Sequence, residues 1–514
     1  MNRRNFIKLA GAASLAVTLP GKSARGQEAP ASAAAGEAAT FSEDWLLSQA
    51  QNLAAQSYSA PVLELPSELS ELDQKQYRAI RFKPDATVWK DQPSKFSLQF
   101  FHTGFQYKTP VDMYLIEDGN IRAFPYAASM FDFAEPLTPP PPDSKSGFSG
   151  VSIAHQIHQQ SSRDPFLMFQ GASFFRALAS GQVFGAIARA VSVNTAQASG
   201  EEFPVFRSLW IQKPAPDDRH IIIYGLLDGP SLTGAYKFRT EPGRMTNMEV
   251  ECSLFPRREL PHVGIAPLNS MYFFGAADQT RLNDYRPNVH SSQGLQIWNA
   301  AGEWIWRPLT NPEALQYSVF VDGTPKGFGL LQRKRAFSDY EDLDGRFGDR
   351  PSVWVEPLGN WGDGAIDLIE VPSRSEIYDN IITFWRPRTP LLAMEQRMFR
   401  YRLHWGWAPP LEPTLASVLQ TRIGSDGEDN AYIFVIDFVS GHSCNVCNLT
   451  AYEADVRVGG GEVRNVAVRN NKATGGQRVT FQYLPEGGKQ TDLRCQLKQN
   501  GQVVSETWVY RWTT

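Results

Sequence analysis

The residues most able to do chemistry lie between Pro325 and Pro387, where aromatic, acidic and arginine side chains recur between short apolar stretches and turn glycines. This mixture suits a cleft that binds a neutral, hydroxyl-rich polymer, because aromatic faces pack on sugar rings and charged groups bond to hydroxyls. Asp379 lies there between Tyr378 and an apolar run. An Asp at such a place is most often a turn residue, but partial desolvation would raise its pKa and make it a proton donor near neutral pH.

Other residues of this region are candidates for substrate binding. Three tryptophans could stack on sugar rings or could equally belong to the core: Trp354, Trp361 and Trp385. Two carboxylates could hold hydroxyl groups in a bidentate manner: Glu356 and Asp363. Two arginines could donate to hydroxyls, or could pair with the acidic residues between positions 342 and 349: Arg346 and Arg350.

The bulk properties set the scale of the elements that must position these residues. The chain has 514 residues, enough for two domains. Its net charge of -4 and pI of about 6.1 show no basic footprint for nucleic acid or an anionic membrane. The sequence shows no metal-ligand spacing of the usual kind, nucleotide-binding loop or serine-nucleophile motif, so we expect no cofactor and no metal.

The N-terminus reads as a targeting segment. Arg3 and Arg4 precede an apolar run from Leu9 to Leu19 and then small residues, which predicts a twin-arginine signal peptide over residues 1–26, with an ordinary secretory signal as the alternative. The apolar run is too short to span a bilayer, so we expect no membrane insertion after the signal is removed. Residues 27–40 are small and polar and predict a disordered linker.

The rest of the chain predicts an all-β protein with two sandwiches. Helical spacing favours helices over 41–57 and 70–80 and a short one over 169–179. From residue 94, alternating or β-branched runs between turn residues predict the strands of a large β-sandwich catalytic domain over 41–407. A proline-rich linker at 408–413 precedes further short strands, which predict an immunoglobulin-like sandwich over 414–514.

Four cysteines allow three interpretations. Cys444 and Cys447 have the spacing of a redox or zinc motif, but no second pair accompanies them, so a structural zinc site is disfavoured. A disulfide from Cys495 to one of this pair would suit an oxidising compartment. Free, partly buried thiols are the default.

Several motifs, in one order, resemble a known family. They include FQGASFFRA from Phe169, SLTGAYKF from Ser231, GIAPLNSM from Gly264, GEWIWRPL from Gly302 and the central run described above. Together they resemble the periplasmic glucan biosynthesis proteins OpgG and OpgD (MdoG and MdoD), and OpgD more closely. The resemblance implies a large galactose-mutarotase-like β-sandwich joined to an immunoglobulin-like domain, a periplasmic location, and action on osmoregulated glucans with a β-1,2-linked glucose backbone.

The resemblance also assigns roles to residues. Characterised relatives look like inverting glycoside hydrolases that cut β-1,2-glucan internally, which requires a carboxylic acid as proton donor and a second group that activates the nucleophile. The family's general acid lies in a Leu/Tyr-Asp-Asn motif, which corresponds here to Asp379. Tyr340 would be retained as a sugar contact, whereas Phe347 stands where relatives have a Tyr.

The chain departs from the family at the base. Relatives have His-Asp-Ser-Asp where this chain has His290, Ser291, Ser292 and Gln293, so Ser291 occupies the position of the base. A long insertion near residue 425 is also missing. We therefore expect an enzyme in which a sugar hydroxyl replaces water as acceptor, a transglycosylase or cyclase on linear β-1,2-glucan. The base that activates the acceptor is not identified, and Asp342, Asp344 and Asp349 are candidates by position only. The alternatives are an endo-β-1,2-glucanase and a weakened or non-catalytic glucan-binding protein. A homodimer is one arrangement that a long cleft would allow.

Overall fold

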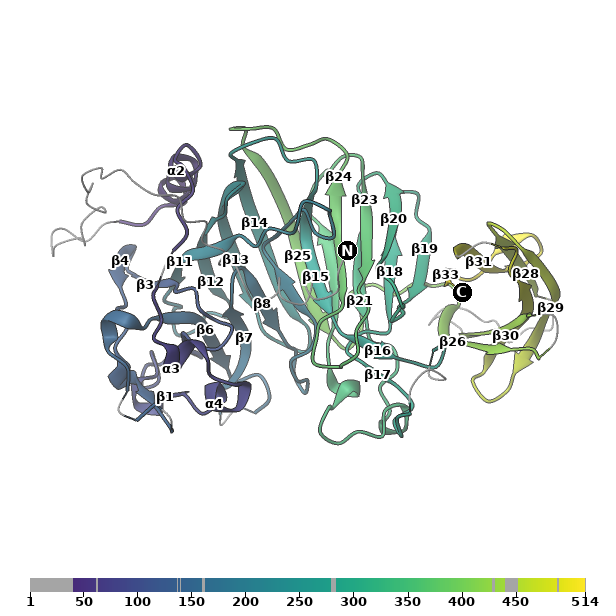
Figure 1. The fold of residues 1–514 in the computed structure, drawn as a ribbon, viewed down its shortest axis with the longest axis horizontal. Helices are drawn as coiled ribbons and strands as arrows, with labels where there is room; N and C mark the ends of the chain where they lie inside the picture. Colours follow the sequence, from purple (N-terminus) through teal and green to yellow (C-terminus); the bar gives the residue numbers. More distant parts are fainter. Residues whose placement is uncertain are drawn as a thin grey trace.

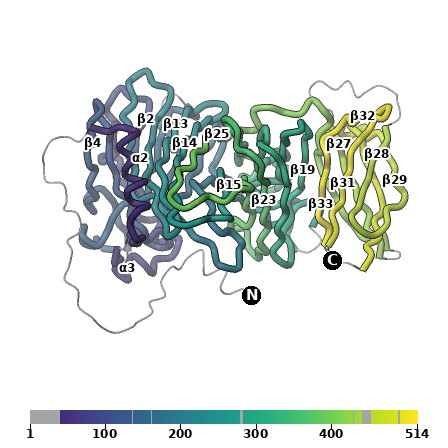
Figure 2. The backbone as a smooth tube through the Cα atoms, turned by 90° about the horizontal axis from the view of Figure 1, so that it is seen from above, coloured from purple at the N-terminus to yellow at the C-terminus, as the bar shows by residue number. Residues whose placement is uncertain are grey.

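The structure is a computed structural model that describes residues 40–513, except 62, 136, 139, 160–161, 279–282, 428–429, 440–451 and 488–489. The predicted signal peptide, nearly all of the predicted linker after it, and Cys444 with Cys447 lie outside the described residues. Every helix among the described residues is too short or too polar to cross a membrane. The chain runs along the long axis of the molecule, from the N-terminal part at one end to the C-terminal sandwich at the other (Figures 1 and 2).

Two large sheets form the body of the protein, which confirms the all-β sandwich. The ten-stranded sheet has the order β2 (Phe96–His102), β6 (Phe148–His155), β7 (Asp164–Gln170), β8 (Phe174–Ala177), β9 (Ile187–Arg189), β15 (Val263–Ser270), β24 (Ile381–Pro387), β23 (Gly364–Glu370) and β20 (Gln316–Asp322), with β10 (Val191–Val193) paired to β15. The main core contains residues of this sheet and of the fifteen-stranded one.

The fifteen-stranded sheet crosses from the large sandwich into the C-terminal one. Its order is β28 (Glu453–Val458), β31 (Gln490–Gln499), β33 (Thr507–Thr513), β19 (Trp304–Pro308), β18 (Gly294–Trp298), β21 (Gly327–Leu331), β22 (Ser352–Pro357), β25 (Arg397–Gly406), β14 (Thr246–Pro256), β13 (Leu232–Glu241), β12 (Ile221–Asp228), β11 (Val205–Gln212), β3 (Asp112–Glu117) and β4 (Asn120–Ala123), with β32 (Gln502–Val503) paired to β31. A parallel pairing of β19 with β33 makes the crossing. The C-terminal sandwich is therefore joined to the large one by main-chain hydrogen bonding.

A four-stranded sheet completes the C-terminal sandwich. Its order is β26 (Ser417–Ser425), β27 (Tyr432–Val439), β30 (Gly476–Leu484) and β29 (Glu462–Asn471). It shares a core with β31 and β33 that also contains Trp306 and Trp354 of the large sandwich. The two sandwiches thus have a common apolar boundary.

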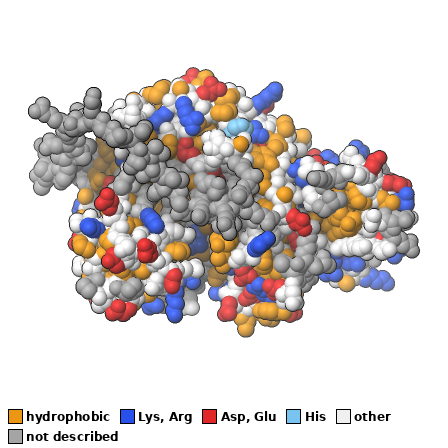
Figure 3. Space-filling model, viewed as in Figure 1, with side chains coloured by type: hydrophobic (Ala, Val, Ile, Leu, Met, Phe, Trp, Pro, Cys, Tyr) orange, Lys and Arg blue, Asp and Glu red, His pale blue; other side chains and the backbone are white. Residues whose placement is uncertain are grey.

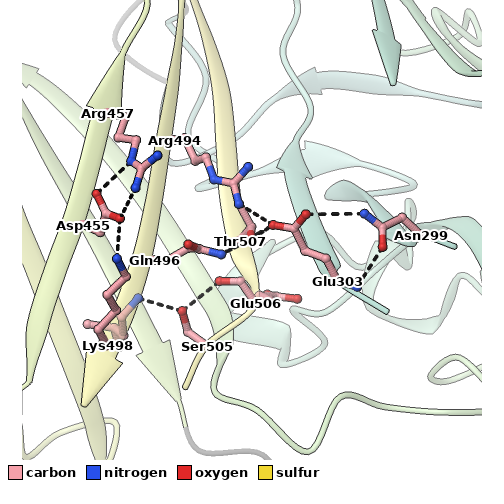
Figure 4. A network of polar contacts seen from close by, with 11 residues as sticks. Asn299, Glu303, Asp455, Arg457, Arg494, Gln496, Lys498, Ser505, Glu506 and Thr507 are labelled. Carbon is pink, nitrogen blue, oxygen red and sulfur yellow. Dashed lines mark hydrogen bonds and ion pairs between the residues drawn. The ribbon is translucent and has the colours of Figure 1, made fainter. Parts of the chain in front are cut away.

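Polar side chains reinforce the same junction. Glu506 is fully buried and accepts hydrogen bonds from both terminal nitrogens of Arg333 at 2.6 and 3.0 Å, and from the main-chain N–H of Val418 at 2.6 Å. The Arg333 guanidinium also lies 3.5 Å from the centroid of the Trp306 ring. Beside it, Glu303 accepts from residues of β31 and β33 (Figure 4).

The helices are few and short. They are α2 (Glu43–Ala54), α3 (Ser67–Ser70) and α4 (Gln74–Arg78), with 3-10 turns η1 (Pro84–Ala86), η2 (Ala128–Met130), η3 (Asp143–Lys145), η5 (Phe337–Asp339) and η6 (Phe347–Asp349). Helix α2 begins as predicted after Ser42, whose side chain accepts from the main-chain N–H of Trp45. The predicted helix over 169–179 is wrong: Gly171 and Ala172 have φ of 76° and 44°, and this turn makes β7 and β8 a hairpin.

Candidate active site

Asp379 lies at the start of β24, on the loop that follows β23. Its neighbour Asn380 fixes this position. The Asn380 side chain donates to the carbonyl oxygens of Tyr272 at 2.9 Å and Val371 at 3.1 Å, and it accepts from the main-chain N–H of Tyr272 at 2.8 Å. Because Asn380 is 3% exposed and all three bonds go to main chain, the Asn of the Tyr-Asp-Asn motif acts as an anchor for the Asp before it.

The electrostatic environment of Asp379 suits a proton donor. The residue is exposed to solvent, yet desolvation by the surrounding protein raises the pKa of its carboxyl group above the ordinary value, and the charges of Arg176 and Arg350 oppose this only in part. Asp379 is therefore accessible to a substrate and holds its proton more tightly than a free carboxyl group does.

Arg350 connects Asp379 to the position where relatives would have their base. Its Nη1 donates to Ser291 Oγ at 2.5 Å, and its guanidinium lies 4.3 Å from the centroid of the Phe347 ring. Burial lowers the pKa of Arg350, and the charges of Asp379, Glu376 and Asp342 raise it, in that order of strength. The guanidinium therefore lies among three carboxylates and is held in place by Ser291.

Ser291 lacks, among the described residues, a partner that could make it a base. It is 3% exposed at the end of β17 (Val289–His290), which pairs with β16 (Tyr272–Phe274). Its hydroxyl accepts from a cation, and a guanidinium does not remove a proton from it. Burial lowers the pKa of the neighbouring His290 to about 3, so that imidazole stays neutral and stacks at 5.4 Å on Tyr272.

Gln293 makes structural contacts in place of an acid. Its Nε2 donates to the carbonyl oxygen of Leu419 on β26 at 3.2 Å, and its Oε1 accepts from the main-chain N–H of Lys334 at 3.2 Å. The segment that follows Ser291 is thereby tied to the C-terminal sandwich.

A cluster around Arg286 holds the loops beside Asp379 and was missed by sequence reasoning. Arg286 pairs with Asp284 at 2.8 Å, Asp342 at 2.8 Å and Glu376 at 2.6 Å. Burial acts to raise the pKa of Asp342, but the Gly345 N–H and Arg286 outweigh it and leave that pKa below the ordinary value. The four side chains come from three loops far apart in the sequence, so no local pattern announces the cluster.

Two of the other predicted contacts are buried, and one is engaged elsewhere. Tyr340 is 2% exposed and donates to the carbonyl oxygen of Lys334 at 3.0 Å, so its hydroxyl does not face a substrate. Phe347 is equally buried and packs on Tyr340. Arg346 pairs with Asp349 at 2.7 Å, which was the alternative to a sugar contact. Tyr378, by contrast, is 52% exposed beside Asp379.

The three tryptophans proposed to stack on sugars belong to the core. Trp354, Trp361 and Trp385 are 2%, 3% and 0% exposed, so no ring face is open to a ligand. Alternation along a strand did not distinguish a core tryptophan from one that stacks on a sugar, because both faces of these strands are covered. The most exposed tryptophan among the described residues is Trp407, at 39%, whose Nε1 donates to the carbonyl oxygen of Ser180 and whose ring lies 5.0 Å from the Arg335 guanidinium.

The two predicted hydroxyl-binding carboxylates lie away from Asp379. Asp363 precedes β23 and is adjacent to the far end of β24, about 20 Å along a seven-residue strand from Asp379. Glu356 is near the end of β22, whereas Arg350 precedes the start of that strand. Glu356 accepts from Arg402 and His404. The structure thus brings together Asp379, Tyr378, Arg350 and Ser291, and it adds Arg176 and Glu376, which sequence reasoning did not assign.

Charge on the surface is mixed. In Figure 3, acidic and basic side chains of the described residues are interspersed over the visible face. Cys495, which was a candidate for a disulfide, is a buried free thiol among the described residues.

Comparison with known proteins places the chain. The family profile "Periplasmic glucan biosynthesis protein, MdoG" matches residues 41–512. Proteins named glucans biosynthesis protein G are 41% identical in Bradyrhizobium diazoefficiens and 42% identical in Rhodopseudomonas palustris, over the whole of both chains. The protein of that name in Vibrio cholerae is 40% identical over 92% of this chain and 87% of its own.

A solved structure, that of the Slr1438 protein from Synechocystis, shares 7% identity over 51% of this chain and 88% of its own, with a TM-score of 0.19, which supports no inference. The relatives are named for the G protein, so the nearer likeness to OpgD stays a prediction. The match over nearly the whole chain, together with the residues gathered at the start of β24, shows that the chain belongs to the periplasmic glucan biosynthesis protein family.

Proposed function

We propose that this protein acts in the periplasm on linear β-1,2-glucan as an anomer-inverting transglycosylase, with Asp379 as general acid. The observation that carries the proposal is the environment of Asp379: a solvent-accessible carboxyl group with a raised pKa, at a position that an anchored Asn fixes. Binding of a neutral polymer does not require a carboxyl group with a raised pKa, whereas general acid catalysis does.

The reaction proposed is a single displacement. Asp379 gives its proton to the glycosidic oxygen as the bond from that oxygen to C1 breaks. A hydroxyl of the acceptor sugar attacks C1 from the opposite face, its proton passes to a base, and the new bond is an α-glucosidic bond. If the acceptor belongs to the same chain, the product is a ring closed by one α bond.

The absence of an acid at position 291 supports a sugar acceptor over water. Ser291 accepts a hydrogen bond from Arg350, and Gln293 bonds to main chain, so neither can activate a water molecule. Apart from the proposed acid Asp379, two carboxylates act on Arg350 by charge, and the side chain of Glu376 is 36% exposed whereas that of Asp342 is 10% exposed. We therefore favour Glu376 over Asp342 as the base that takes the proton of the acceptor hydroxyl. The lowered pKa of Asp342 reflects its bonds to Arg286 and to main-chain N–H groups.

The test is to incubate the mature protein with linear β-1,2-glucan and to follow reducing ends and product masses together. Products one water lighter than the linear glucans, with few new reducing ends, are expected. Reducing ends that rise with each bond cleaved would show an endo-glucanase, and unchanged glucan would favour the non-catalytic binding protein.

A further inference from the structure

A groove lies where the two sandwiches meet, apart from the Asp379 site. It has a volume of about 320 Å³, within the range of roughly 300–1,000 Å³ for small-ligand sites. Strand β20, an edge of the ten-stranded sheet, forms one wall, and β28, β31 and β33 form the other. The side chains that give the groove its charge and its apolar walls are those of Val319, Phe320, Arg457, Arg494, Tyr510 and Arg511.

Two arginines of the groove lie directly opposite each other. Arg457 on β28 pairs in register with Arg494 on β31, and like charges in that arrangement destabilise a sheet. Each is held by a carboxylate, Arg457 by Asp455 at 2.8 Å and Arg494 by Glu303 at 2.5 Å (Figure 4). Two opposed arginines, each held by a carboxylate at the rim of a groove, indicate a site for a ligand rather than a contribution to folding.

The pairing of charges indicates what kind of ligand. Arg511 also has a carboxylate partner, Asp492, at 3.0 Å. Each of these three arginines is thus paired with a carboxylate, of which Asp492 itself lines the groove, so the positive charge is largely balanced and an anion gains little. Hydroxyl groups can accept from the guanidiniums and donate to the carboxylates, and a neutral polyhydroxylated chain satisfies both.

The walls between these charges are apolar. Val319 is 45% exposed on β20, next to Phe320. Across the groove lies Val509, which pairs in register with Arg494, next to Tyr510, which is 7% exposed and stacks on Trp508 in the core of the C-terminal sandwich. An apolar wall with a rim of hydrogen-bonding groups suits the two kinds of surface on a pyranose ring.

The groove is within reach of a polymer that occupies the Asp379 site. Strand β20 is two strands from β24 in the ten-stranded sheet, with β23 between them. Phe320 on β20 pairs with Ile366 on β23. Four residues further along β23, Glu370 pairs with the first residue of β24. Strand spacing and rise per residue give a separation on the order of 15–20 Å.

We propose that this junction groove, defined by Arg457, Arg494, Arg511, Val319 and Tyr510, is a second, non-catalytic binding site for a neutral glucan chain. It holds a distal part of the polymer while another part occupies the Asp379 site. This proposal rests on the proposed function. It adds that long glucans bind more tightly than short ones because they also contact the junction groove.

The test compares chain lengths. Titration calorimetry measures the binding of short and long linear β-1,2-glucans to the Asp379→Asn protein. When the double change Arg457→Ala and Arg494→Ala is added to that protein, long glucan should bind several-fold more weakly and short glucan should bind as before. In the otherwise native protein the double change should raise KM for long glucan and leave kcat and the KM for short glucan unchanged. Arg469→Ala, on exposed β29 of the same sandwich, is the matched control.

A second variant guards against misfolding. Val319→Glu should block the groove, because the new carboxylate would pair with its arginines. In the double variant, the removal of Arg494 leaves Glu303 with Gln496 and Thr507 as hydrogen-bond partners, so Glu303 does not lose all its contacts. If the protein turns over glucan and neither variant changes the KM for long glucan, the proposal of a groove site is wrong and the proposed function stands. No binding of glucan to the Asp379→Asn protein and no turnover by the native one would overturn both the groove and the proposed function.

Discussion

Asp379 combines access to solvent with a carboxyl group that resists ionisation. Exposure alone would leave its pKa ordinary, and full burial would keep the substrate away. Asp379 keeps an exposed side chain while desolvation by nearby protein raises the pKa of its carboxyl group, and Arg176 and Arg350 limit how far that pKa rises. The carboxyl group of Asp379 therefore keeps its proton to a higher pH than a free Asp side chain does.

The first prediction concerns the change Asp379→Asn, which preserves shape and removes the proton donor. Turnover should fall by about 10²–10⁴-fold. The same change should raise Tm at pH 8, because a pKa raised in the folded state means that the ionised carboxylate disfavours folding once pH exceeds that pKa. The gain should shrink as pH falls below the folded-state pKa toward about 3.9, the ordinary value for Asp, because both states are protonated only below that value. Tm measured across this range, with activity at each pH, checks both parts; an Asn variant that melts lower at pH 8 would contradict the account.

The second prediction concerns Ser291→Asp, which places a carboxylate next to Arg350. Arg350 Nη1 is 2.5 Å from Ser291 Oγ, so the new carboxylate would be ionised and able to accept a proton from water. The share of bonds that end in hydrolysis, measured as reducing ends per glucan consumed, should increase. Ser291→Asn is the control of equal size without charge. Equal shares in the two variants would show that the acid at this position does not direct the choice of nucleophile.

At the scale of elements, the junction between the sandwiches depends on one buried carboxylate. Glu506→Ala would leave the Arg333 guanidinium without its ion-pair partner, and removing one member of a buried pair typically costs about 3–5 kcal/mol. Unfolding by urea should show a loss of that size. Glu462→Ala, which removes an exposed pair with Arg464 in the same sandwich, should leave the free energy of unfolding almost unchanged. Similar losses in the two variants would mean that Glu506 does not hold the junction.

Local patterns predicted elements well where one residue type decides the outcome. Ser42 caps α2 as expected, and alternating runs became β12, β13 and β14. The helix expected over 169–179 failed because the turn at Gly171 outweighs the spacing of its apolar residues. The Arg286 cluster and the β19–β33 pairing join segments far apart in the chain, and spacing in one sequence holds no information about such contacts.

At the scale of the whole molecule, stability should depend on pH through three histidines. Burial lowers the pKa of His102 and His155 to about 4 and that of His290 to about 3. The unfolded chain takes up protons on them below about pH 6.5 while the folded protein does not, so stability should fall as pH decreases from 6.5 toward 4.

The free energy of unfolding, measured by denaturant at several pH values, checks this dependence on the histidines. His290→Gln should reduce the slope of that free energy with pH, whatever its effect on absolute stability. A slope that none of the buried histidines alters would assign acid sensitivity to carboxylates instead.

The pairing of β19 with β33 has a consequence for the order of folding. Ile305 lies next to Thr507 in the sheet, although about 200 residues separate them, and β33 is the last strand of the chain among the described residues. Until β33 leaves the ribosome, β19 is an uncovered sheet edge with Trp306 on it, a place where other chains can add. The large sandwich, which holds Asp379, can therefore complete its sheet only after β33 has been synthesised.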